Sequence, residues 1–256
     1  MVSFLWKTTP VEHLALDGWD GVTAWMSGRR GGVSEPPFAS LNLSPHVKDA
    51  PAAVSENRRR ALLPAQSRRA LWARPEHGGR VQAVNRATEE VRPGDGLLTD
   101  DPGVVLAQTF ADCVPIFVWA EDIGWGGILH AGWRGTVANI AAAGVRALVE
   151  RGAEAWRVQA AIGPSIGPCC YEVREDVAER IRDLPRGGEF LRPVDEERFS
   201  LDLWRLNQSL LVDAGVSAER VSLSGLCTGC ELSRFFSHRR EGPTGRMGGF
   251  FCLQDR

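Results

Sequence analysis

Residues 130–136, His-Ala-Gly-Trp-Arg-Gly-Thr, place a histidine, an arginine and two glycines between an apolar run at 124–129 and a helix-like run at 137–150. This pattern predicts a strand-to-helix turn, where glycines let the backbone approach a ligand and free helix N–H groups favour anions. A second polar break, 111–115 (Ala-Asp-Cys-Val-Pro), separates two apolar runs upstream. Cys113 and His130 could therefore converge on one point, as metal ligands or as a nucleophile and its base.

His77 precedes Gly78-Gly79 and also follows an expected strand. Together, His77, Cys113 and His130 form a set of three protein ligands, the number that catalytic zinc sites use while keeping a fourth position open. Their spacing matches no compact metal-binding motif, so the hypothesis depends on residue type and position. In the rival interpretation Cys113 is a nucleophile, His130 is its base and Asp112 orients that base. The residues alone leave both readings open.

The remaining cysteines give weaker signals. Cys227-Thr228-Gly229-Cys230 is a single CxxC, which is half of a zinc site or a redox motif, and no second CxxC is present. Cys169 and Cys170 are adjacent, and neighbouring thiols rarely bind one ion together. We interpret these four as unpaired structural thiols beside turns. Basic residues at 237–240 and 244–246 indicate a solvated loop or, alternatively, a clamp for phosphate or carboxylate.

Bulk composition narrows the class of protein. The chain has 256 residues, 43% hydrophobic and 24% charged, as globular proteins do. Its formal net charge of −2 gives no broad basic surface for nucleic acid. We find no signal peptide in residues 1–10 and no apolar run of about 20 residues that would span a membrane. We therefore expect a cytoplasmic protein whose thiols are free or bound to metal.

Hydrophobic periodicity and turn residues predict a mixture of strands and helices. We expect helices at 49–63, with Asp49 as its cap, and at 137–150, 174–184 and 201–214. We expect strands at 18–27, from 71, and at 81–84, 103–110, 114–119, 124–129, 156–162, 221–226, 235–237 and 248–253, with a turn at 94–96. Strands and helices do not alternate strictly, so the pattern favours a mixed-sheet α+β or α/β layered sandwich.

Many separate segments, in one order, resemble the laccase-domain family of multicopper polyphenol oxidoreductases, whose members are also described as purine nucleoside-processing enzymes. The resemblance covers most of the chain. It runs through 31–34, 41–43, 56–58, 77–78, 95–96, 111–115, 130–136, 162–166, 169–173, 201–203, 227–228, 236–240 and 244–246.

The resemblance implies a single domain over residues 1–256, with a sandwich fold shared with a bacterial toxin of cysteine-hydrolase type. It implies one zinc ion held by His77, Cys113 and His130. It also implies phosphorolysis of adenosine, inosine and methylthioadenosine to base and ribose 1-phosphate, with deamination of adenosine. Copper-dependent oxidation of polyphenols is an older assignment in the family, and one branch has been connected with editing of peptidoglycan precursors.

The chain departs from the family pattern at two places. Pro75-Glu76 replaces the usual Gln-Val before the first ligand, which removes a backbone donor and adds a negative charge beside His77. His238 replaces the tyrosine that usually follows Phe-Ser. We therefore expect the geometry near His77 to be the part that differs most from the family.

The nucleoside interpretation assigns further roles. Zinc lowers the pKa of bound water to about 7, and such a hydroxide can attack C6 of adenine. Phosphate near C1′ of ribose would need a clamp, for which Arg58, Arg134 and Arg240 are candidates. Asn42 could bind a sugar hydroxyl or a base edge, and Asp112 could orient a histidine ligand.

Three alternatives remain. Five histidines are too few for a multicopper array, so we expect copper, if it binds, to occupy the same three-ligand site. A cysteine hydrolase and a non-catalytic module that binds a nucleoside or a glycan are the others. The expected partners are a purine nucleoside and phosphate, with no nucleic acid and no membrane, in a monomer or small homo-oligomer.

Overall fold

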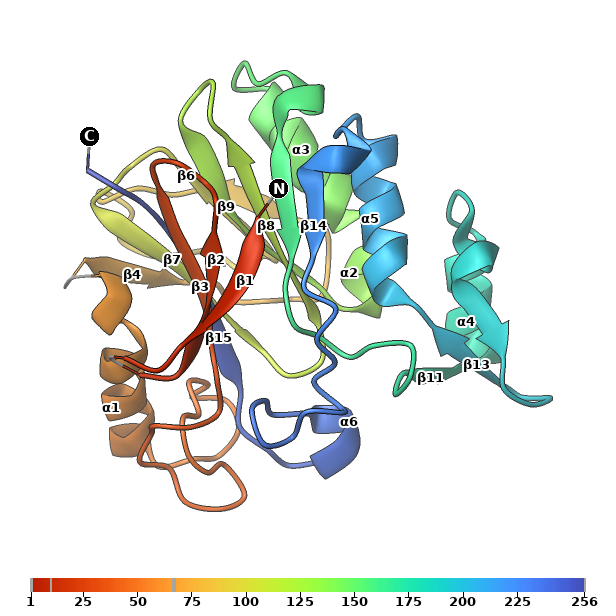
Figure 1. Cartoon of the computed structure of the whole chain (residues 1–256), viewed down its shortest axis with the longest axis horizontal. Helices are drawn as coiled ribbons and strands as arrows, with labels where there is room; N and C mark the ends of the chain where they lie inside the picture. Colours follow the sequence, from red (N-terminus) through yellow and green to blue (C-terminus); the bar gives the residue numbers. More distant parts are fainter. Residues whose placement is uncertain (1, 10, 66–67, 256) are drawn as a thin grey trace.

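A computed structural model describes residues 2–9, 11–65 and 68–255. Met1 and Pro10, the ends of the segment inspected for a signal peptide, lie outside these residues. The described strands form two six-stranded sheets and one small three-stranded sheet. Figure 1 shows α1 on one side of the large sheets, α3 and α5 on the other, and the small sheet with α4 projecting at the right. The predicted mixed α/β fold is confirmed.

The first large sheet has the C-terminal strand β15 near its middle. β15 pairs antiparallel with β3 on one side and β7 on the other, and β4 pairs parallel with β7 at the edge. In spatial order the strands are β1 (Ser3–Lys7), β2 (His13–Asp17), β3 (Val22–Ser27), β15 (Met247–Leu253), β7 (Val104–Phe110) and β4 (Arg69–Trp72).

The second large sheet is built around the β8–β9 hairpin, whose register places Pro115 opposite His130. In spatial order its strands are β14 (Val221–Leu223), β10 (Gln159–Ile162), β8 (Val114–Ala120), β9 (Trp125–Ala131), β6 (Gly96–Thr99) and β5 (Val81–Ala83). The small sheet contains β11 (Glu172–Arg174), β13 (Arg198–Leu201) and β12 (Leu191–Pro193).

The helices are short and connect or cover these sheets. The α-helices are α1 (Pro51–Ala61), α2 (Trp133–Val137), α3 (Ile140–Val149), α4 (Glu175–Arg182), α5 (Leu203–Asp213) and α6 (His238–Glu241). The 3₁₀ helices are η1 (Leu63–Ala65), η2 (Ala155–Arg157), η3 (Gly187–Phe190) and η4 (Ala218–Arg220).

Three apolar clusters hold the layers together. One packs α3 and α5 onto the second sheet through residues such as Leu129 and Leu206. The largest aromatic residues between the two sheets include Phe117 and Phe251. A third cluster packs α1 against the outer face of the first sheet through Trp25 and other residues. Burial on both faces explains why the central strands read as continuous apolar runs in the sequence.

Several expectations about elements are confirmed, including the strands at 103–110, 114–119, 124–129 and 248–253. The strand predicted at 235–237 is wrong, because this segment is a bend followed by irregular backbone that leads into α6. The helix predicted at 137–150 begins only at Ile140, because Asn139 adopts a left-handed conformation with φ 54° and separates α3 from α2.

Other boundaries also differ from expectation. β1 and β2 were not predicted, and the turn predicted at 94–96 leads directly into β6, which was also missed. Asp49 does not cap α1, whose N-cap is Ala50. The Asp49 carboxylate instead accepts hydrogen bonds from Ser34 Oγ and Asn42 Nδ2.

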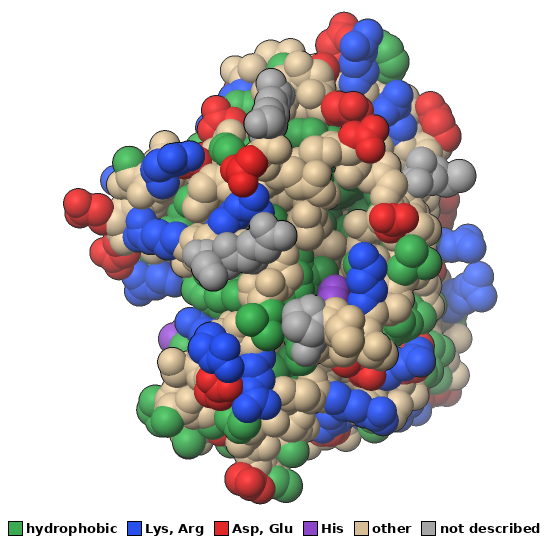
Figure 2. Space-filling view, turned by 60° about the vertical axis from the view of Figure 1, so that its left-hand side comes forward, with side chains coloured by type: hydrophobic (Ala, Val, Ile, Leu, Met, Phe, Trp, Pro, Cys, Tyr) green, Lys and Arg blue, Asp and Glu red, His purple; other side chains and the backbone are tan. Residues whose placement is uncertain are grey.

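Basic and acidic side chains are interspersed on the face of the molecule in Figure 2, as a net charge of −2 would suggest. Within the described ranges, none of the helices has the length and apolar character needed to cross a membrane.

Candidate metal centre

Three side chains that are distant in sequence meet where the two large sheets adjoin. His77 lies in the loop after β4, Cys113 lies between β7 and β8, and His130 is near the end of β9. One potential ligand atom from each lies within 4.8 Å of the others. His77 is exposed, Cys113 is half-buried and His130 is buried. The structure thus brings together the three residues that the sequence analysis proposed as metal ligands.

Asp95 fixes the position of two of these ligands, a role that the sequence analysis missed. Its buried carboxylate accepts backbone N–H bonds from Glu76, His77 and Gly78, at 3.3, 2.9 and 2.8 Å. Its carbonyl oxygen accepts from the backbone N–H of His130 at 2.7 Å. The sequence signals were its place between two glycines, which predicts a simple turn, and its presence in one of the segments that resemble the family.

The Pro75-Glu76 departure leaves this loop intact. The three donors to Asp95 begin at Glu76, so the N–H that Pro75 lacks is not used there. The Glu76 residue is exposed, so water surrounds its charge. The expectation that the geometry near His77 differs most from the family stays a prediction.

The surroundings of the His130 ring suit a metal ligand. Its ring packs against Phe110, with 4.9 Å between centroids, and against His77, with 5.3 Å. Both ring nitrogens are buried and have no hydrogen-bond partner in the described part of the chain. Burial, with a smaller contribution from His77, lowers the pKa of His130 to about 3, so the ring is neutral. A buried neutral imidazole with a free nitrogen fits metal binding.

Cys113 is the third donor. Burial raises the pKa of its thiol to about 12 in the absence of an ion. A bound cation favours the thiolate, so metal binding at this site would release a proton. Gly132 allows the thiol and the histidine to approach each other: a Cβ there would lie 2.8 Å from Cys113 Sγ and 3.4 Å from His77 Cδ2. Gly132 lies in the turn where the sequence predicts a close approach of the backbone to a ligand, and it lies close to two of the candidate metal-binding side chains.

Two pockets share the candidate ligands. The smaller, of about 240 Å³, is lined by Trp133, Arg134 and Tyr171 among others. The larger, of about 710 Å³, is lined by Arg58, Trp72 and Arg246 among others. His77, Cys113, Ala111 and His238 line both. The larger volume lies in the range of small-molecule sites, about 300–1,000 Å³.

Of the three arginines predicted as candidates for a phosphate clamp, Arg58 and Arg134 line the pockets and Arg240 does not. Arg58 lies over Trp72 at 3.8 Å and donates to Leu43 O, and burial lowers its pKa to about 10. Arg134 lies over Trp133 at 4.3 Å and is exposed. Arg240 lines neither pocket; it donates to Cys170 Sγ at 3.1 Å. The assignment of Arg240 to this site is wrong, whereas Arg246, part of the possible anion clamp at 244–246, lines the larger pocket.

Asn42 is not free to bind a substrate. It is fully buried, its Nδ2 donates to Ser44 O and Asp49 Oδ2, and its Oδ1 accepts from the backbone N–H groups of Ser44 and Arg246. The proposed contact to a sugar or base is therefore wrong. Asn42 positions the backbone of Arg246 instead.

Asp112 lines the smaller pocket but does not orient a histidine. Its Oδ1 accepts from Thr228 Oγ1 at 2.6 Å and its Oδ2 accepts from Arg239 N at 2.7 Å. Its backbone has φ 84°. The predicted bond to a histidine is corrected: the carboxylate holds two C-terminal loops beside Cys113.

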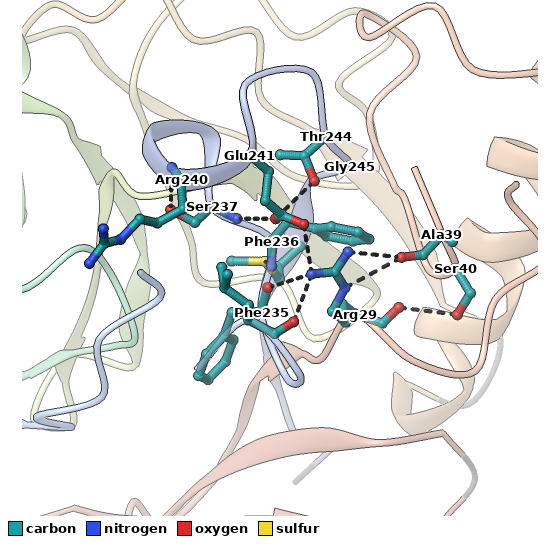
Figure 3. Close-up of polar contacts among 12 residues, drawn as sticks. Arg29, Ala39, Ser40, Phe235, Phe236, Ser237, Arg240, Glu241, Thr244 and Gly245 are labelled. Carbon is teal, nitrogen blue, oxygen red and sulfur yellow. Dashed lines mark hydrogen bonds and ion pairs between the residues drawn. The ribbon is translucent and has the colours of Figure 1, made fainter. Parts of the chain in front are cut away.

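Arg29 anchors the same C-terminal region from the other side (Figure 3). Its guanidinium donates to Ala39 O, Leu232 O and Phe235 O and forms a 3.0 Å ion pair with Glu241. These contacts join the loop before α1 to the segment that carries His238 and Arg239. The wall of the pockets therefore consists of parts from both halves of the chain.

Comparison with known proteins identifies the family of the chain. A family model described as multi-copper polyphenol oxidoreductase laccase matches residues 23–254. The chain belongs to this family. The resemblance inferred from the sequence motifs is thereby confirmed.

Similar proteins carry a different functional name. Purine nucleoside phosphorylase YlmD of Geobacillus stearothermophilus is 40% identical over 245 residues, covering 90% of this chain and 89% of the relative. Purine nucleoside phosphorylase YlmD of Bacillus subtilis is 36% identical over 248 residues, covering 91% and 89%. The crystal structure of Bacillus licheniformis hypothetical protein YfiH has a TM-score of 0.91 at 36% identity, covering 97% of this chain and 99% of that one.

Proposed function

We propose that this protein is a zinc-dependent purine nucleoside phosphorylase that also deaminates adenosine. The observation that carries the proposal is the His77, Cys113 and His130 group between two pockets, in a chain similar to proteins named purine nucleoside phosphorylase. The proposed substrates are adenosine, inosine and methylthioadenosine, each with phosphate.

The donor set supports zinc over copper. Two imidazoles and one thiolate, with an open fourth position, suit catalytic zinc. Oxidation of phenols by a multicopper mechanism needs several copper centres with many histidines. The other ligand cluster found among the described residues consists of four cysteines. Metal analysis of protein purified without added copper decides between the two ions.

The residues of the pockets suggest how a nucleoside and phosphate would be held. Trp133 and Tyr171 offer aromatic surface for a purine in the smaller pocket. Arg58 and Arg246 offer guanidinium groups for phosphate in the larger pocket. In phosphorolysis a phosphate oxygen forms a bond to C1′ of ribose as the bond from C1′ to the base breaks, which gives base and ribose 1-phosphate. A zinc ion at the shared ligands would supply Lewis acidity.

Deamination requires a different placement of the same substrate. In deamination, water adds at C6 of the adenine ring and ammonia leaves, so C6 must lie beside the metal ligands. In phosphorolysis, C1′ of ribose would lie there instead. The two reactions therefore require two orientations of the nucleoside across the shared ligands. Removing the phosphate clamp is expected to weaken phosphorolysis more than deamination.

The test is incubation of the zinc-loaded protein with adenosine and phosphate, following adenine, inosine, hypoxanthine and ribose 1-phosphate by mass spectrometry. We expect Cys113→Ala to lose zinc and both activities, and Arg246→Gln to raise the KM for phosphate about tenfold or more because a charged hydrogen bond is lost. Cys252→Ala, a buried cysteine in β15, is the control and should retain both activities. Full turnover by Cys113→Ala would refute the proposal. Activity that survives chelation but is lost with iodoacetamide would instead support a cysteine hydrolase.

We also infer a cytoplasmic location, because a reducing compartment keeps six cysteines as thiols or metal ligands. A monomer or small homo-oligomer remains the expected assembly, which light scattering of the purified protein would measure.

A further inference from the structure

A second cluster of potential metal ligands lies outside the site described above. Cys169 and Cys170 lie in the loop between β10 and β11, and Cys227 and Cys230 lie in the loop after β14. β10 and β14 pair in parallel, and an isolated bridge between Ser165 and Cys227 continues their alignment. The four Sγ atoms all lie within 4.8 Å of one another.

These four cysteines, which we interpreted from the sequence as unpaired structural thiols, are free thiols that the fold gathers into one cluster. The sequence showed one CxxC and one adjacent pair, and neither alone is a metal site. The pairing of β10 with β14 brings the two halves together, and local spacing does not reveal this contact. The adjacent thiols can point to one centre because the chain turns at this point, with the N–H groups of Cys170 and Tyr171 both donating to Gly167 O.

The distances fit a tetrahedral thiolate site. Cys230 Sγ lies 3.4 Å from Cys169 Sγ and 3.5 Å from Cys170 Sγ. Four sulfurs at about 2.3 Å from a zinc ion lie about 3.8 Å from one another in a regular tetrahedron. The sulfurs are thus close to the separation that an ion would need, and all four cysteines are free thiols.

N–H groups donate hydrogen bonds to two of the four sulfurs. The backbone N–H of Gly167 donates to Cys227 Sγ at 3.2 Å, and Arg240 Nη2 donates to Cys170 Sγ at 3.1 Å. Gly229 keeps the loops close, because a Cβ there would lie 2.9 Å from Cys170 Cβ. Hydrogen bonds from N–H groups to ligand sulfurs are typical of the surroundings of metal sites.

We propose that Cys169, Cys170, Cys227 and Cys230 bind one zinc ion in a closed four-cysteine structural site. Four thiols lose four protons as the ion binds, which leaves a centre with a net charge of −2 that Arg240 partly offsets. With all four positions filled by protein, the ion has no open position for a substrate. Its role is to join the loop after β10 to the loop after β14.

The site would also stiffen the wall of the smaller pocket. Thr228, within the CxxC, donates to the carboxylate of Asp112, and Ile166 N donates to the Asp112 carbonyl oxygen. Both cysteine-bearing loops therefore contact the residue that precedes Cys113. Arg240, wrongly assigned to phosphate by the sequence analysis, belongs to this second cluster.

Zinc content per chain tests the proposal independently of catalysis. We expect two zinc ions by native mass spectrometry and by elemental analysis of protein purified in reductant without chelators. Cys230→Ser should contain one, Cys113→Ala should contain one, and the matched control Cys252→Ser should contain two. Cys113→Ala empties the proposed catalytic site only, so failure of one proposal does not affect the other. Equal zinc content in the wild type and Cys230→Ser would overturn the four-cysteine site, whatever the content of Cys113→Ala.

Cobalt spectroscopy identifies the ligands. Co²⁺ added to metal-free Cys113→Ala should give intense visible bands of tetrahedral geometry with sulfur-to-cobalt charge transfer, and these should be lost in Cys113→Ala/Cys230→Ser. If Cys113→Ala does not fold, His77→Ala serves as the background. Alkylation of the denatured wild type with chelator and without reductant should modify all six thiols. Modification of only four would show a disulfide and contradict the proposal.

Discussion

At the scale of single residues, Asp95 has the largest influence on the candidate metal centre without being a ligand. Its carboxylate holds the backbone before and after His77, and its carbonyl oxygen holds the backbone of His130. Two of the three ligands are thus positioned by one buried residue.

We expect Asp95→Asn to weaken zinc binding at this centre about 10- to 100-fold, the usual effect of losing a group that orients ligands. The variant should also lose about 1–3 kcal/mol of unfolding free energy, because an amide offers one acceptor oxygen to three N–H donors. Zinc competition with a chelator and urea unfolding measure the two effects. Asp101→Asn is the matched control, since Asp101 also accepts backbone N–H bonds but follows the opposite end of β6. It should lose stability and keep its zinc affinity; equal affinities in wild type and Asp95→Asn would contradict the assigned role.

His130 should make the metal-free protein sensitive to mild acid. Its folded pKa of about 3 lies below the unfolded value of about 6.5, so the unfolded chain takes up the proton first as pH falls. Stability is therefore complete above about pH 6.5 and decreases below it, by about 1.4 kcal/mol at about pH 5.5 for this residue. Burial also lowers the pKa of His13, which acts in the same direction. Urea unfolding above about pH 6.5 and at about pH 5.5 should show a smaller decrease in the free energy of unfolding for His130→Gln than for the wild type. An identical decrease in both proteins would refute the argument.

At the scale of elements, short breaks between secondary structures carry the site. The β7-to-β8 connection leaves the first sheet and enters the second, and Cys113 lies in it. The β9-to-α2 connection carries His130 and Gly132. α2 ends at Val137, and the side chain of Asn139 then accepts from Ala142 N and caps α3. This break lets α3 change direction and pack on the second sheet.

Substitution of Asn139 tests the importance of that break. Asn139→Ala should lose about 1–2 kcal/mol of unfolding free energy, because the cap is lost and alanine disfavours a left-handed conformation. Asn139→Gly also loses the cap but adopts positive φ easily, so it should be the more stable of the two variants. Urea unfolding of both variants checks the order. If Asn139→Ala proved as stable as the wild type, the cap and the left-handed backbone would have no energetic role.

Local patterns in the sequence were sufficient for the strands at 103–110, 114–119 and 124–129. Cys113 and His130 stand near the ends of these apolar runs, where a polar break is easily recognised, but their role as metal ligands together with His77, one of two interpretations that the residues left open, was implied by the family resemblance. The sequence was insufficient where a role depends on contacts between distant segments. Asn42 and Arg240 have residue types suited to a substrate, but their partners are the backbone of Arg246 and the thiol of Cys170.

The same limit explains the missed elements. β1 is the edge strand of the first sheet, and its alternation of exposed and half-buried residues gives little hydrophobic contrast. β2 is mostly buried but only five residues long. Asp95 could be recognised as part of a turn, but not as an acceptor for the loop at His77. The four-cysteine cluster depends on the parallel pairing of β10 with β14. The spacing of the cysteines along the sequence does not reveal this pairing.

At the scale of the whole molecule, two sheets and two layers of helices surround a site at the meeting point of the sheets. His77 follows a strand of the first sheet, His130 belongs to the second, and Cys113 connects the two. A change in the packing between the sheets would therefore move the ligands relative to one another. Phe117 and Phe251, buried between the sheets, contribute to holding that spacing.

The central place of β15 has a consequence for how the molecule is made. During synthesis, β1, β2 and β3 emerge from the ribosome first and β7 soon afterwards. In the sheet, β3 and β7 are joined only by β15 (Met247–Leu253), which lies between them. The nascent chain must therefore keep two apolar sheet edges apart, or shielded by chaperones, until nearly the whole sequence has been translated. Pairings between such distant segments also fold slowly, because a long loop must close before they gain contacts.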